Sequence, residues 1–375
     1  MRILELTNYS AGVCGVWQRV KQEAELLSKK YEVYIFSSDI TKGSGELALP
    51  EDTLGRVKIK RFPTKKLGGE SFMSWDFTAE AIKLRPDIII AHSYRHLHTT
   101  KALKIAKKIN AKVFLVTHAP FIEGNSTRSF FSKVAVSIYD KFIARRILNE
   151  FDRIITITKW EAPFLLALGA KKEKISYVPN GIPKEFFKPK ISQFNGDSIL
   201  FFGRIANIKN LETLIKSFKL VSTEYPQLKL KITGPQEQPC TSNLKNLASK
   251  LKIRNLRFFP PVYSLRERVD ALRNTDIFVL PSISEAMPQA LVEAMAVGKI
   301  VISSDNKAGK EIISDKKDGF LFKTGDEKNL SEVILFILAK KNLRRIKEIQ
   351  KQARIKAEEF RWDILIGKIE KLILS

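Results

Sequence analysis

The chain has few cysteines and no long apolar segment. Its 375 residues include only two cysteines, Cys14 and Cys240, which cannot form a disulfide framework, so we expect an intracellular protein. No apolar run reaches the roughly 18 residues that a membrane-spanning helix needs, and residues 1–10 lack the apolar core of a signal peptide. We therefore expect a cytoplasmic protein without a transmembrane helix.

The motifs that mark common cofactor and metal sites are also missing. The sequence contains no G-x-G-x-x-G, the glycine pattern of dinucleotide-binding loops. It contains no D-x-D, and its His, Cys, Asp and Glu residues form no cluster with metal-ligand spacing. We therefore expect neither a bound cofactor nor an essential metal ion.

Acidic residues are too few to balance the basic ones. The 65 lysines and arginines against 40 aspartates and glutamates give a formal net charge of +25. Such a balance attracts polyanions, of which nucleic acid, an anionic membrane surface and a phosphate-rich substrate are the candidates. A nucleic-acid-binding protein is thus an alternative, and it predicts salt-dependent binding to any duplex. No recognition motif supports it, and a generally basic surface explains the evenly spread charge equally well.

Strands and helices alternate along the chain, and its length favours two domains over one. An apolar strand at Arg2–Thr7 is followed by a glycine-containing loop and a helix at Val16–Lys30. A second alternation of this kind starts with a strand at Ser198–Gly203. Between the two, the Pro-Asn-Gly turn at 179–181 and the polar run at 189–197 predict a domain boundary.

Two histidines follow or end strands in the first half. His92 ends a strand at Asp87–His92, and His118 follows a strand at Ala111–Thr117. A histidine at a strand end is usually a structural hydrogen-bonding group. Because ligand sites in α/β proteins form at the carboxyl ends of the strands, both residues are also candidates for ligand contact.

Arg204 and Lys209 follow the strand at Ser198–Gly203, where the next helix opens. A pyrophosphate bound there would meet helix N–H groups and two fixed cations. Cleavage of a nucleotide sugar leaves extra negative charge on the departing diphosphate, so such cations stabilise the transition state. Either residue taken alone is also explained as an ordinary surface charge.

Pro281–Gly298 indicates a loop and a helix between two apolar strands, with Glu285 on the loop, Pro288 in the first helical turn and Glu293 inside the helix. Two carboxylates in one pocket suggest glycoside hydrolysis. However, about eight helical residues would hold them about 12 Å apart, and a retaining glycosidase needs about 5 Å. Separate duties fit better, with each carboxylate accepting hydrogen bonds from a different part of a ligand. The alternative is a solvated helix face carrying two ordinary charges.

The E-x7-E pattern of Glu285 and Glu293, followed by Ala-Met-Ala and Gly298, resembles the donor-site motif of the retaining glycosyltransferases of family 4, which have the GT-B fold. Other blocks appear in the order found in that family. They include the Pro-Asn-Gly turn at 179–181 and a G-R-x4-K block from Gly203 to Lys209. The resemblance extends from residue 1 to about residue 365, nearly the whole chain.

The resemblance implies two Rossmann-like domains with doubly wound parallel sheets that face a cleft. The acceptor-side domain is expected at 1–185 and the nucleotide-sugar domain at 186–360, with a last helix at 361–375 packing back on the first domain. The implied reaction moves a hexose-type sugar from a nucleoside-diphosphate sugar to a glycan or lipid-linked acceptor, with retention of the anomeric configuration. We expect an oxocarbenium-like transition state in which the departing phosphate takes the proton of the acceptor.

The resemblance also assigns roles to residues. His118 would meet the donor sugar, Arg204 and Lys209 the diphosphate, Glu285 the sugar hydroxyls and Glu293 the ribose hydroxyls. The expected catalytic set is therefore His118, Arg204, Lys209 and Glu285. The rest of the expected donor site is Gly15, Val262, Ala286, Met287, Pro288 and Glu293. Gly15 and His92 are candidates for the acceptor side.

Three residues depart from the pattern of the family. Cys14 replaces the first glycine of a Gly-Gly pair, so that only Gly15 carries over. Asn210 stands where a glycine usually follows the lysine, and Ala286 where a glycine usually follows the first glutamate. The Cβ atom of Ala286 would narrow the pocket for the sugar.

Two segments bear on the acceptor. Lys65–Phe77 mixes lysine, glycine and aromatic residues, which suits an acceptor-side or membrane-touching loop or an ordinary surface loop. Ser129–Asn149 is basic and amphipathic, which suits a helix lying on an anionic membrane or a helix packed on its own sheet. A lipid-linked acceptor and a peripheral place at the membrane fit the first interpretation of each segment. A small soluble acceptor, or an epimerase of the same fold, remains an alternative.

Overall fold

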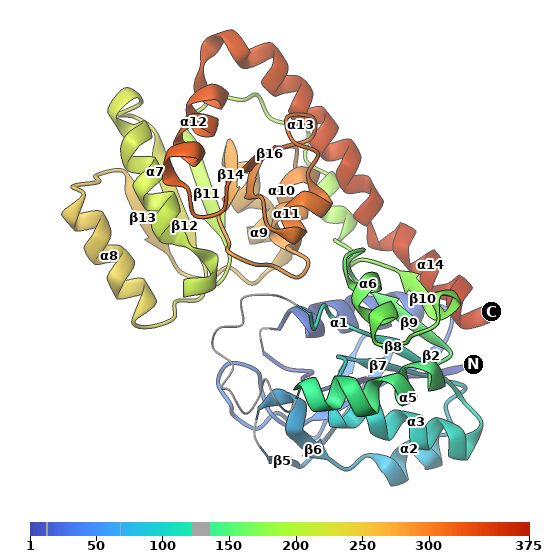
Figure 1. Cartoon of the computed structure of the whole chain (residues 1–375). Coiled ribbons are helices and arrows are strands. Elements are labelled where there is room, and N and C mark those ends of the chain that lie inside the picture. Colours follow the sequence, from blue (N-terminus) through green and yellow to red (C-terminus); the bar gives the residue numbers. More distant parts are fainter. Residues whose placement is uncertain (13, 68, 122–135) are drawn as a thin grey trace. The chain divides into compact units, whose positions relative to one another are not determined.

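The computed structural model describes residues 1–12, 14–67, 69–121 and 136–375. These residues form two compact units (Figure 1). Unit 1 comprises Met1–Gly181 and Trp362–Ser375, and unit 2 comprises Ile182–Arg361. Each unit has a mainly parallel sheet whose strands are connected by helices, and this confirms the predicted α/β class.

The main sheet of unit 1 has eight strands in the order β10-β9-β8-β7-β1-β2-β4-β3. Every neighbouring pair is parallel except β3 and β4. The strands are β1 (Arg2–Thr7), β2 (Glu32–Ser38), β3 (Glu51–Leu54), β4 (Val57–Phe62), β7 (Ile88–His92), β8 (Lys112–Val116), β9 (Arg153–Thr156) and β10 (Ile175–Tyr177). The chain leaves β1 toward β2 on one side and toward β7 on the other. This is the topological switch point at which parallel sheets open a crevice for ligands.

The helices of unit 1 are short to medium in length. They are α1 (Gly15–Leu27), α2 (Thr78–Leu84), α3 (Leu97–Ile109), the π-helix η2 (Tyr139–Ala144), α5 (Arg145–Ile147), α6 (Glu161–Ala167) and α14 (Trp362–Leu374), with 3₁₀ turns η1 (Glu70–Phe72), η3 (Leu148–Glu150) and η4 (Lys172–Lys174). The strand β7 is buried along its whole length, and its first four residues, Ile88–Ala91, are apolar, as is typical of a parallel strand covered on both faces.

The C-terminal helix α14 packs on α1 within unit 1. The guanidinium of Arg19 lies 5.5 Å from the centre of the Trp362 ring, and Lys30 forms an ion pair with Glu370 at 2.8 Å. The glycine of the Pro-Asn-Gly turn lies against the same ring, because a Cβ atom on Gly181 would come within 2.6 Å of Trp362. The turn therefore needs glycine to make room for the C-terminal helix.

The sheet of unit 2 has six parallel strands in the order β13-β12-β11-β14-β15-β16. Its strands are β11 (Ser198–Phe202), β12 (Lys229–Thr233), β13 (Leu256–Phe259), β14 (Ile277–Leu280), β15 (Ile300–Ser304) and β16 (Phe320–Phe322). Its switch point lies between β11 and β14. The two loops that the sequence singled out, after Phe202 and after Leu280, leave the sheet there.

Helices lie on both sides of the sheet of unit 2 (Figure 1). They are α7 (Leu211–Glu224), α8 (Cys240–Lys250), α9 (Leu265–Arg273), α10 (Gln289–Ala296), α11 (Lys307–Ile312), α12 (Glu327–Leu338) and α13 (Leu343–Ala357), with 3₁₀ turns η5 (Lys184–Phe187), η6 (Asn207–Lys209), η7 (Lys340–Asn342) and η8 (Glu358–Phe360). The amphipathic helices α7 and α12 pack against each other, and α10 packs against α13.

The segment Lys65–Phe77, which the sequence suggested to be an acceptor-side, membrane-touching or ordinary surface loop, contains regular structure, and its Phe72 is exposed. It contributes to a small antiparallel hairpin of β5 (Thr64–Lys66) and β6 (Met73–Trp75), although residue 68 lies outside the described residues. Trp75 and Phe77 are buried, with ring centres 4.6 Å apart. These aromatic rings stabilise the core of unit 1, because they pack on the apolar edge of the sheet.

The described part of the segment Ser129–Asn149, residues 136–149, is helical throughout. Residues 129–135 lie outside the described residues, and the helix after them changes to the wider π form over Tyr139–Ala144. Ala144 and Leu148 are buried in the core, whereas Ile138 and Phe142 are exposed. The described part of the predicted apolar face is therefore divided between the core and the surface.

Candidate functional site

Two glycines bring the ends of β11 and β12 close together in unit 2. Gly203 donates from its N–H to the carbonyl of Thr233 at 3.0 Å. A Cβ atom on Gly234 would lie 1.9 Å from the carbonyl oxygen of Gly203, and Gly234 has a φ of +149°. Only glycine fits at position 234, because a Cβ atom there would collide with the backbone of Gly203. After Gly203 the chain enters the loop that carries Arg204 and Lys209.

Lys209 and Glu285, predicted separately, form one contact in the structure. The Nζ atom of Lys209 lies 2.5 Å from Oε1 of Glu285, and this oxygen also accepts from the hydroxyl of Ser282 at 2.6 Å. The two side chains are only 17% and 12% exposed. The N–H of Ile283 donates to the carbonyl of Ile208 at 2.9 Å, so that the two loops are also connected through their backbones.

Asn210 stands where the family usually has a glycine after the lysine, and its backbone conformation is left-handed. Its φ of 49° and ψ of 45° are left-handed, and it stands at the N-cap position of α7. Asparagine adopts this conformation more readily than other residues with a side chain. The substitution therefore keeps the backbone of the loop. Ala286, by contrast, is not among the residues with a positive φ, so its backbone conformation does not call for glycine.

Glu293 lies inside α10 and is almost fully buried. Its Oε1 atom accepts from Nη2 of Arg268 on α9, a partner that the sequence did not indicate. Its Oε2 atom has no hydrogen-bond partner among the described residues. Burial raises the pKa of Glu293, and the nearby guanidinium of Arg268 opposes that rise. An unpartnered carboxylate oxygen of this kind can accept a hydrogen bond from a ligand hydroxyl.

The helical spacing assumed for the two glutamates is wrong. The helix α10 begins at Gln289, and Pro288 occupies the N-cap position rather than the first turn. Residues 285–288 are thus loop rather than helix, and the separation of about 12 Å that a continuous helix between the two glutamates would give does not apply. The different partners of Glu285 and Glu293, Lys209 and Arg268, support separate duties for the two carboxylates.

The other predicted residues of unit 2 lie on the loops at the same edge of the sheet. Arg204 is 58% exposed, and its Nη1 atom contacts Oε1 of Glu237 at 2.5 Å. Val262 is half-buried on the loop between β13 and α9, and Met287 is half-buried on the loop before α10. Arg204 therefore has a side chain that is free to reach a ligand once it leaves Glu237.

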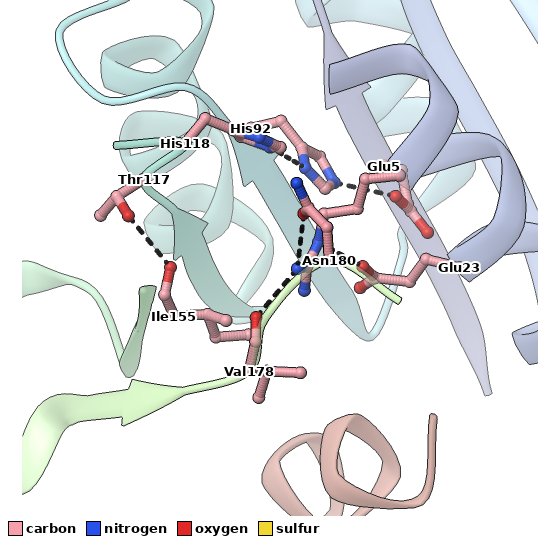
Figure 2. Close-up of polar contacts among 9 residues, drawn as sticks. Glu5, Glu23, His92, Thr117, His118, Ile155, Val178 and Asn180 are labelled. Atoms are coloured by element: carbon pink, nitrogen blue, oxygen red, sulfur yellow. Dashed lines mark hydrogen bonds and ion pairs between the residues drawn. The ribbon is translucent and has the colours of Figure 1, made fainter. Parts of the chain in front are cut away.

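In unit 1, His118 and His92 form a hydrogen-bonded chain with Glu5 (Figure 2). Nε2 of His118 lies 3.0 Å from Nδ1 of His92, and Nε2 of His92 lies 2.9 Å from Oε2 of Glu5. His92 and Glu5 are completely buried and His118 is half-buried. Burial lowers the pKa of both histidines well below the ordinary value. His92 is thus not placed to touch an acceptor directly, because both of its ring nitrogens are bonded inside the protein.

The backbone at His118 is strained and firmly held. His118 and Ala119 have φ values of 59° and 52°, a left-handed conformation that is uncommon for residues with a side chain. The buried carboxylate of Glu161 accepts hydrogen bonds from the N–H of Ala119 and the hydroxyl of Thr117. It also accepts from the N–H of Thr158 at 2.9 Å. These bonds fix the loop that aims the His118 ring.

Arg19 forms a buried ion pair with Glu23, and its positive charge also lowers the pKa of both histidines. Nε of Arg19 contacts Oε2 of Glu23 at 3.0 Å, and both side chains are completely buried. Nη1 of Arg19 donates to the carbonyl of Val178 and to Oδ1 of Asn180. The arginine therefore connects α1 to the Pro-Asn-Gly turn.

Gly15 is the first residue of α1, next to Cys14 at the N-cap position. A Cβ atom on Gly15 would meet nothing within 4 Å, so the protein itself does not require glycine there. Open space at a helix N-terminus suits the close approach of a ligand. Gly15 belongs to unit 1. Of the predicted catalytic set, His118 also belongs to unit 1, whereas Arg204, Lys209 and Glu285 belong to unit 2.

Sequence reasoning missed the residues that position the predicted ones, namely Glu5, Arg19, Glu237, Arg268 and Ser282. One signal was available, because Glu5 is an acidic residue in the middle of an apolar strand, and a buried charge is rare without a partner. The positions of Glu237 and Arg268 carry no such signal.

Within the described ranges, no group of three or more His, Cys, Asp or Glu residues could hold a metal ion. The same ranges contain no helix long and apolar enough to span a membrane.

Two family models together match residues 13–355 of the chain. Residues 13–186 match the model described as Glycosyltransferase Family 4, and residues 184–355 match Glycosyl transferases group 1. The chain is 27% identical over 234 residues to an uncharacterized glycosyltransferase of Haemophilus influenzae, covering 60% of this chain and 59% of that protein. It is 29% identical over 209 residues to an N,N'-diacetylbacillosaminyl-diphospho-undecaprenol alpha-1,3-N-acetylgalactosaminyltransferase of Campylobacter jejuni, covering 51% and 52%. The chain thus spans little more than half the length of these two relatives.

A solved structure resembles the whole chain. The crystal structure of HepE of Anabaena in complex with UDP and glucose superposes with a TM-score of 0.76 at 15% identity, covering 100% of both chains. Agreement over the full length at such low identity shows a shared fold.

Proposed function

This chain belongs to the family 4, group 1 glycosyltransferases, enzymes of the GT-B fold that transfer a sugar from a nucleotide sugar, and from this premise we propose its specific reaction. It moves a hexose-type sugar from a nucleoside-diphosphate sugar to a glycan or lipid-linked acceptor and retains the anomeric configuration. Neither a cofactor nor an essential metal ion takes part.

The contact between Lys209 and Glu285 carries this proposal. A cation and a carboxylate are held together at the switch point of unit 2, between the loops that precede α7 and α10. In the proposed complex, Lys209 and Arg204 bind the diphosphate and Glu285 accepts hydrogen bonds from the sugar hydroxyls. Because Lys209 and Glu285 are held in place before the reaction, Lys209 stabilises the charge that develops on the leaving group without reorganising, and Arg204 joins it after leaving Glu237.

The proposed chemistry needs no protein nucleophile. The bond between the anomeric carbon and the diphosphate oxygen breaks, and the acceptor oxygen bonds to the same face of that carbon. The acceptor proton passes to the departing phosphate oxygen. The protein positions the two substrates and neutralises the diphosphate, and His118 contacts the donor sugar.

Glu293 supplies the second carboxylate of the proposed donor site. Its Oε2 atom has no partner among the described residues, whereas Oε1 is bonded to Arg268. Two adjacent ribose hydroxyls are donors of the kind that such a carboxylate accepts. We therefore assign the nucleoside part of the donor to Glu293 and the sugar part to Glu285.

A lipid-linked acceptor is supported by a surface of unit 1 that we call the basic apolar surface. It consists of the exposed side chains of Ile138, Lys141, Phe142, Ile143, Arg145 and Arg146. Exposed apolar side chains among basic ones are typical of segments that lie on anionic membranes. The Campylobacter relative acts on a diphospho-undecaprenol substrate, which is consistent with a peripheral place at the membrane. A small soluble acceptor is the alternative.

Binding of nucleotides to the whole chain tests the donor site. UDP, GDP and ADP and their sugars are screened by thermal shift, since a ligand that binds only the folded protein raises its apparent stability. UDP is the first probe, because the HepE structure contains it. We expect one nucleotide to raise the melting temperature of the wild type, and Arg204→Ala and Glu293→Ala to abolish the shift.

The matched control is Arg266→Ala, which removes an exposed arginine of α9 and should leave the shift intact. Product analysis with the matching sugar nucleotide, with and without acceptor, then separates a transferase from an epimerase. Stabilisation by duplex DNA with no response to any nucleotide would contradict the proposal and favour the polyanion alternative.

A further inference from the structure

Glu5, His92 and His118 come from three adjacent strands and meet at the switch point of unit 1. Glu5 lies within β1, His92 ends β7, and His118 follows β8. The sheet order places β1, β7 and β8 side by side. The chain of two hydrogen bonds therefore runs from the interior of the sheet to its carboxyl edge, where His118 is half-buried (Figure 2).

The chain can hold its protons in only two arrangements. A neutral imidazole has one N–H donor and one acceptor nitrogen, and burial keeps both histidines neutral. If Glu5 is ionised, His92 must donate from Nε2, His118 must donate from Nε2, and Nδ1 of His118 is left as an acceptor. If Glu5 carries a proton on Oε2, the atom that faces His92, every donor reverses, and Nδ1 of His118 is left carrying the proton. A proton on Oε1 instead would leave a buried hydroxyl with no acceptor among the described residues.

We propose that Glu5 and His92 are positioning residues that hold His118 in the second arrangement. The neutral carboxyl of Glu5 donates to Nε2 of His92, and Nδ1–H of His92 donates to Nε2 of His118. His118 then presents an N–H donor at Nδ1, the nitrogen not used in the chain, to an oxygen of the donor sugar. This inference rests on the proposed function, in which His118 contacts that sugar.

The surroundings of Glu5 favour its neutral form. Its Oε1 atom is buried and has no hydrogen-bond partner among the described residues, so an ionised carboxylate would be poorly compensated. Burial, and after it the nearby carboxylate of Glu23, raise the pKa of Glu5 well above the ordinary value, although the guanidinium of Arg19 opposes the rise. The charged and titratable groups that face the chain are those of Arg19, Glu23, His96 and His98.

Nitrogen chemical shifts of the imidazole rings report the tautomers directly. The whole chain is labelled with ¹⁵N, and its four histidines are assigned by single substitutions. We expect His118 and His92 to carry their protons on Nδ1. In Glu5→Gln the pattern should persist, because the amide donates where the protonated carboxyl does. In Glu5→Leu the donor is lost, so the shifts of His118 should move toward a mixture of tautomers.

The matched control is His98→Gln. The Nε2 atom of His98 bonds to the backbone carbonyl of His92, at 2.7 Å, and not to its ring, so this change should leave the ring shifts of His118 in place. A proton on Nε2 of His118 in the wild type, or shifts of His118 that ignore Glu5→Leu, would overturn the proposal. If Glu5→Leu does not fold, the tautomer of the wild type and the response of Glu5→Gln still decide between the two proton arrangements.

Kinetics give a second readout that a purely structural role would not move. As the pH rises through the raised pKa of Glu5, the proton arrangement reverses, so we expect kcat of the wild type to fall. Glu5→Gln cannot ionise and should lack this alkaline decrease. Glu5→Leu should lower kcat about tenfold with little change in KM, about the worth of the one hydrogen bond to the sugar that His118 no longer presents in the right tautomer. Wild-type inactivity with every sugar nucleotide would count against the proposed function, and the tautomers would still test this inference.

Discussion

The Nζ atom of Lys209 lies 2.5 Å from Oε1 of Glu285, although 76 residues separate the two in the chain. Each side chain is less than one-fifth exposed, so the pair is shielded from much of the surrounding water. Because both groups also belong to loops joined by a backbone hydrogen bond, their geometry is set before a ligand binds. A preorganised cation and carboxylate are what the transfer of a sugar from a diphosphate requires.

Removal of Lys209 should abolish most of the activity without unfolding the protein. We expect Lys209→Ala to lower kcat about 100-fold or more, because a fixed charge that stabilises the leaving group is lost. Glu285 keeps its hydrogen bond from Ser282, so the loop should hold. The measurement is the initial rate with the sugar nucleotide identified by thermal shift. Lys219→Ala, which removes an exposed lysine of α7, is the control, and equal losses in both variants would contradict the assignment.

The histidines and buried glutamates of unit 1 should have opposite effects on the pH dependence of stability. Burial lowers the pKa of His98 to about 4, so below about pH 6.5 the unfolded chain binds a proton that the folded protein does not. His98 therefore makes the free energy of unfolding fall by about 1.4 kcal/mol for each pH unit of acidification in that window. Between pH 7 and pH 5, the free energy of unfolding of His98→Gln should therefore rise by about 2 kcal/mol relative to that of the wild type.

The matched variant is Glu5→Gln. Burial raises the pKa of Glu5, so the folded protein holds a proton that the unfolded chain has lost, and stability falls as the pH rises above the ordinary glutamate range. Glu5→Gln removes this loss, so its free energy of unfolding should rise relative to that of the wild type on going from pH 5 to pH 7. Urea unfolding at the two pH values measures both effects. Changes of the same sign in both variants would refute the assigned pKa directions.

The basic apolar surface should bind anionic vesicles. We expect the protein to sediment with vesicles containing phosphatidylglycerol at low salt and to remain in solution with phosphatidylcholine alone. Phe142→Ala should weaken vesicle binding about tenfold, since a large exposed ring no longer enters the interface. Leu220→Ala removes an exposed apolar side chain of α7 and should have no effect. Absence of binding at low salt would rule out the membrane part of the proposal.

Asn210 should tolerate glycine and no branched residue. Its left-handed backbone suits glycine, so Asn210→Gly should change the free energy of unfolding by only a few tenths of a kcal/mol. Asn210→Val should cost about 1–2 kcal/mol, because a branched side chain clashes in this conformation. Asn207→Val, at an exposed neighbouring position without a positive φ, is the control. Chemical denaturation measures all three, and equal costs for the two valine variants would contradict the backbone argument.

Local patterns in the sequence were enough to predict the α/β class and many elements. The strand predicted at Arg2–Thr7 is β1, and the helix predicted at Val16–Lys30 overlaps α1 in the sequence. Consecutive apolar residues in buried parallel strands, and a period near 3.6 in amphipathic helices, are properties of adjacent residues. The loops with Lys209 and Glu285 could likewise be located, because each follows an apolar strand and opens a helix.

Only the tertiary structure decided which side chains meet. Arg268 as the partner of Glu293, the ring of Trp362 against Gly181, and the chain from Glu5 to His118 all join segments far apart in sequence. The burial of Trp75 was likewise decided by the sheet it packs on. A sequence pattern encodes periodicity and backbone preference over a few residues. The partner of a buried charge or ring depends on how distant strands are ordered in the sheet, which that pattern does not contain.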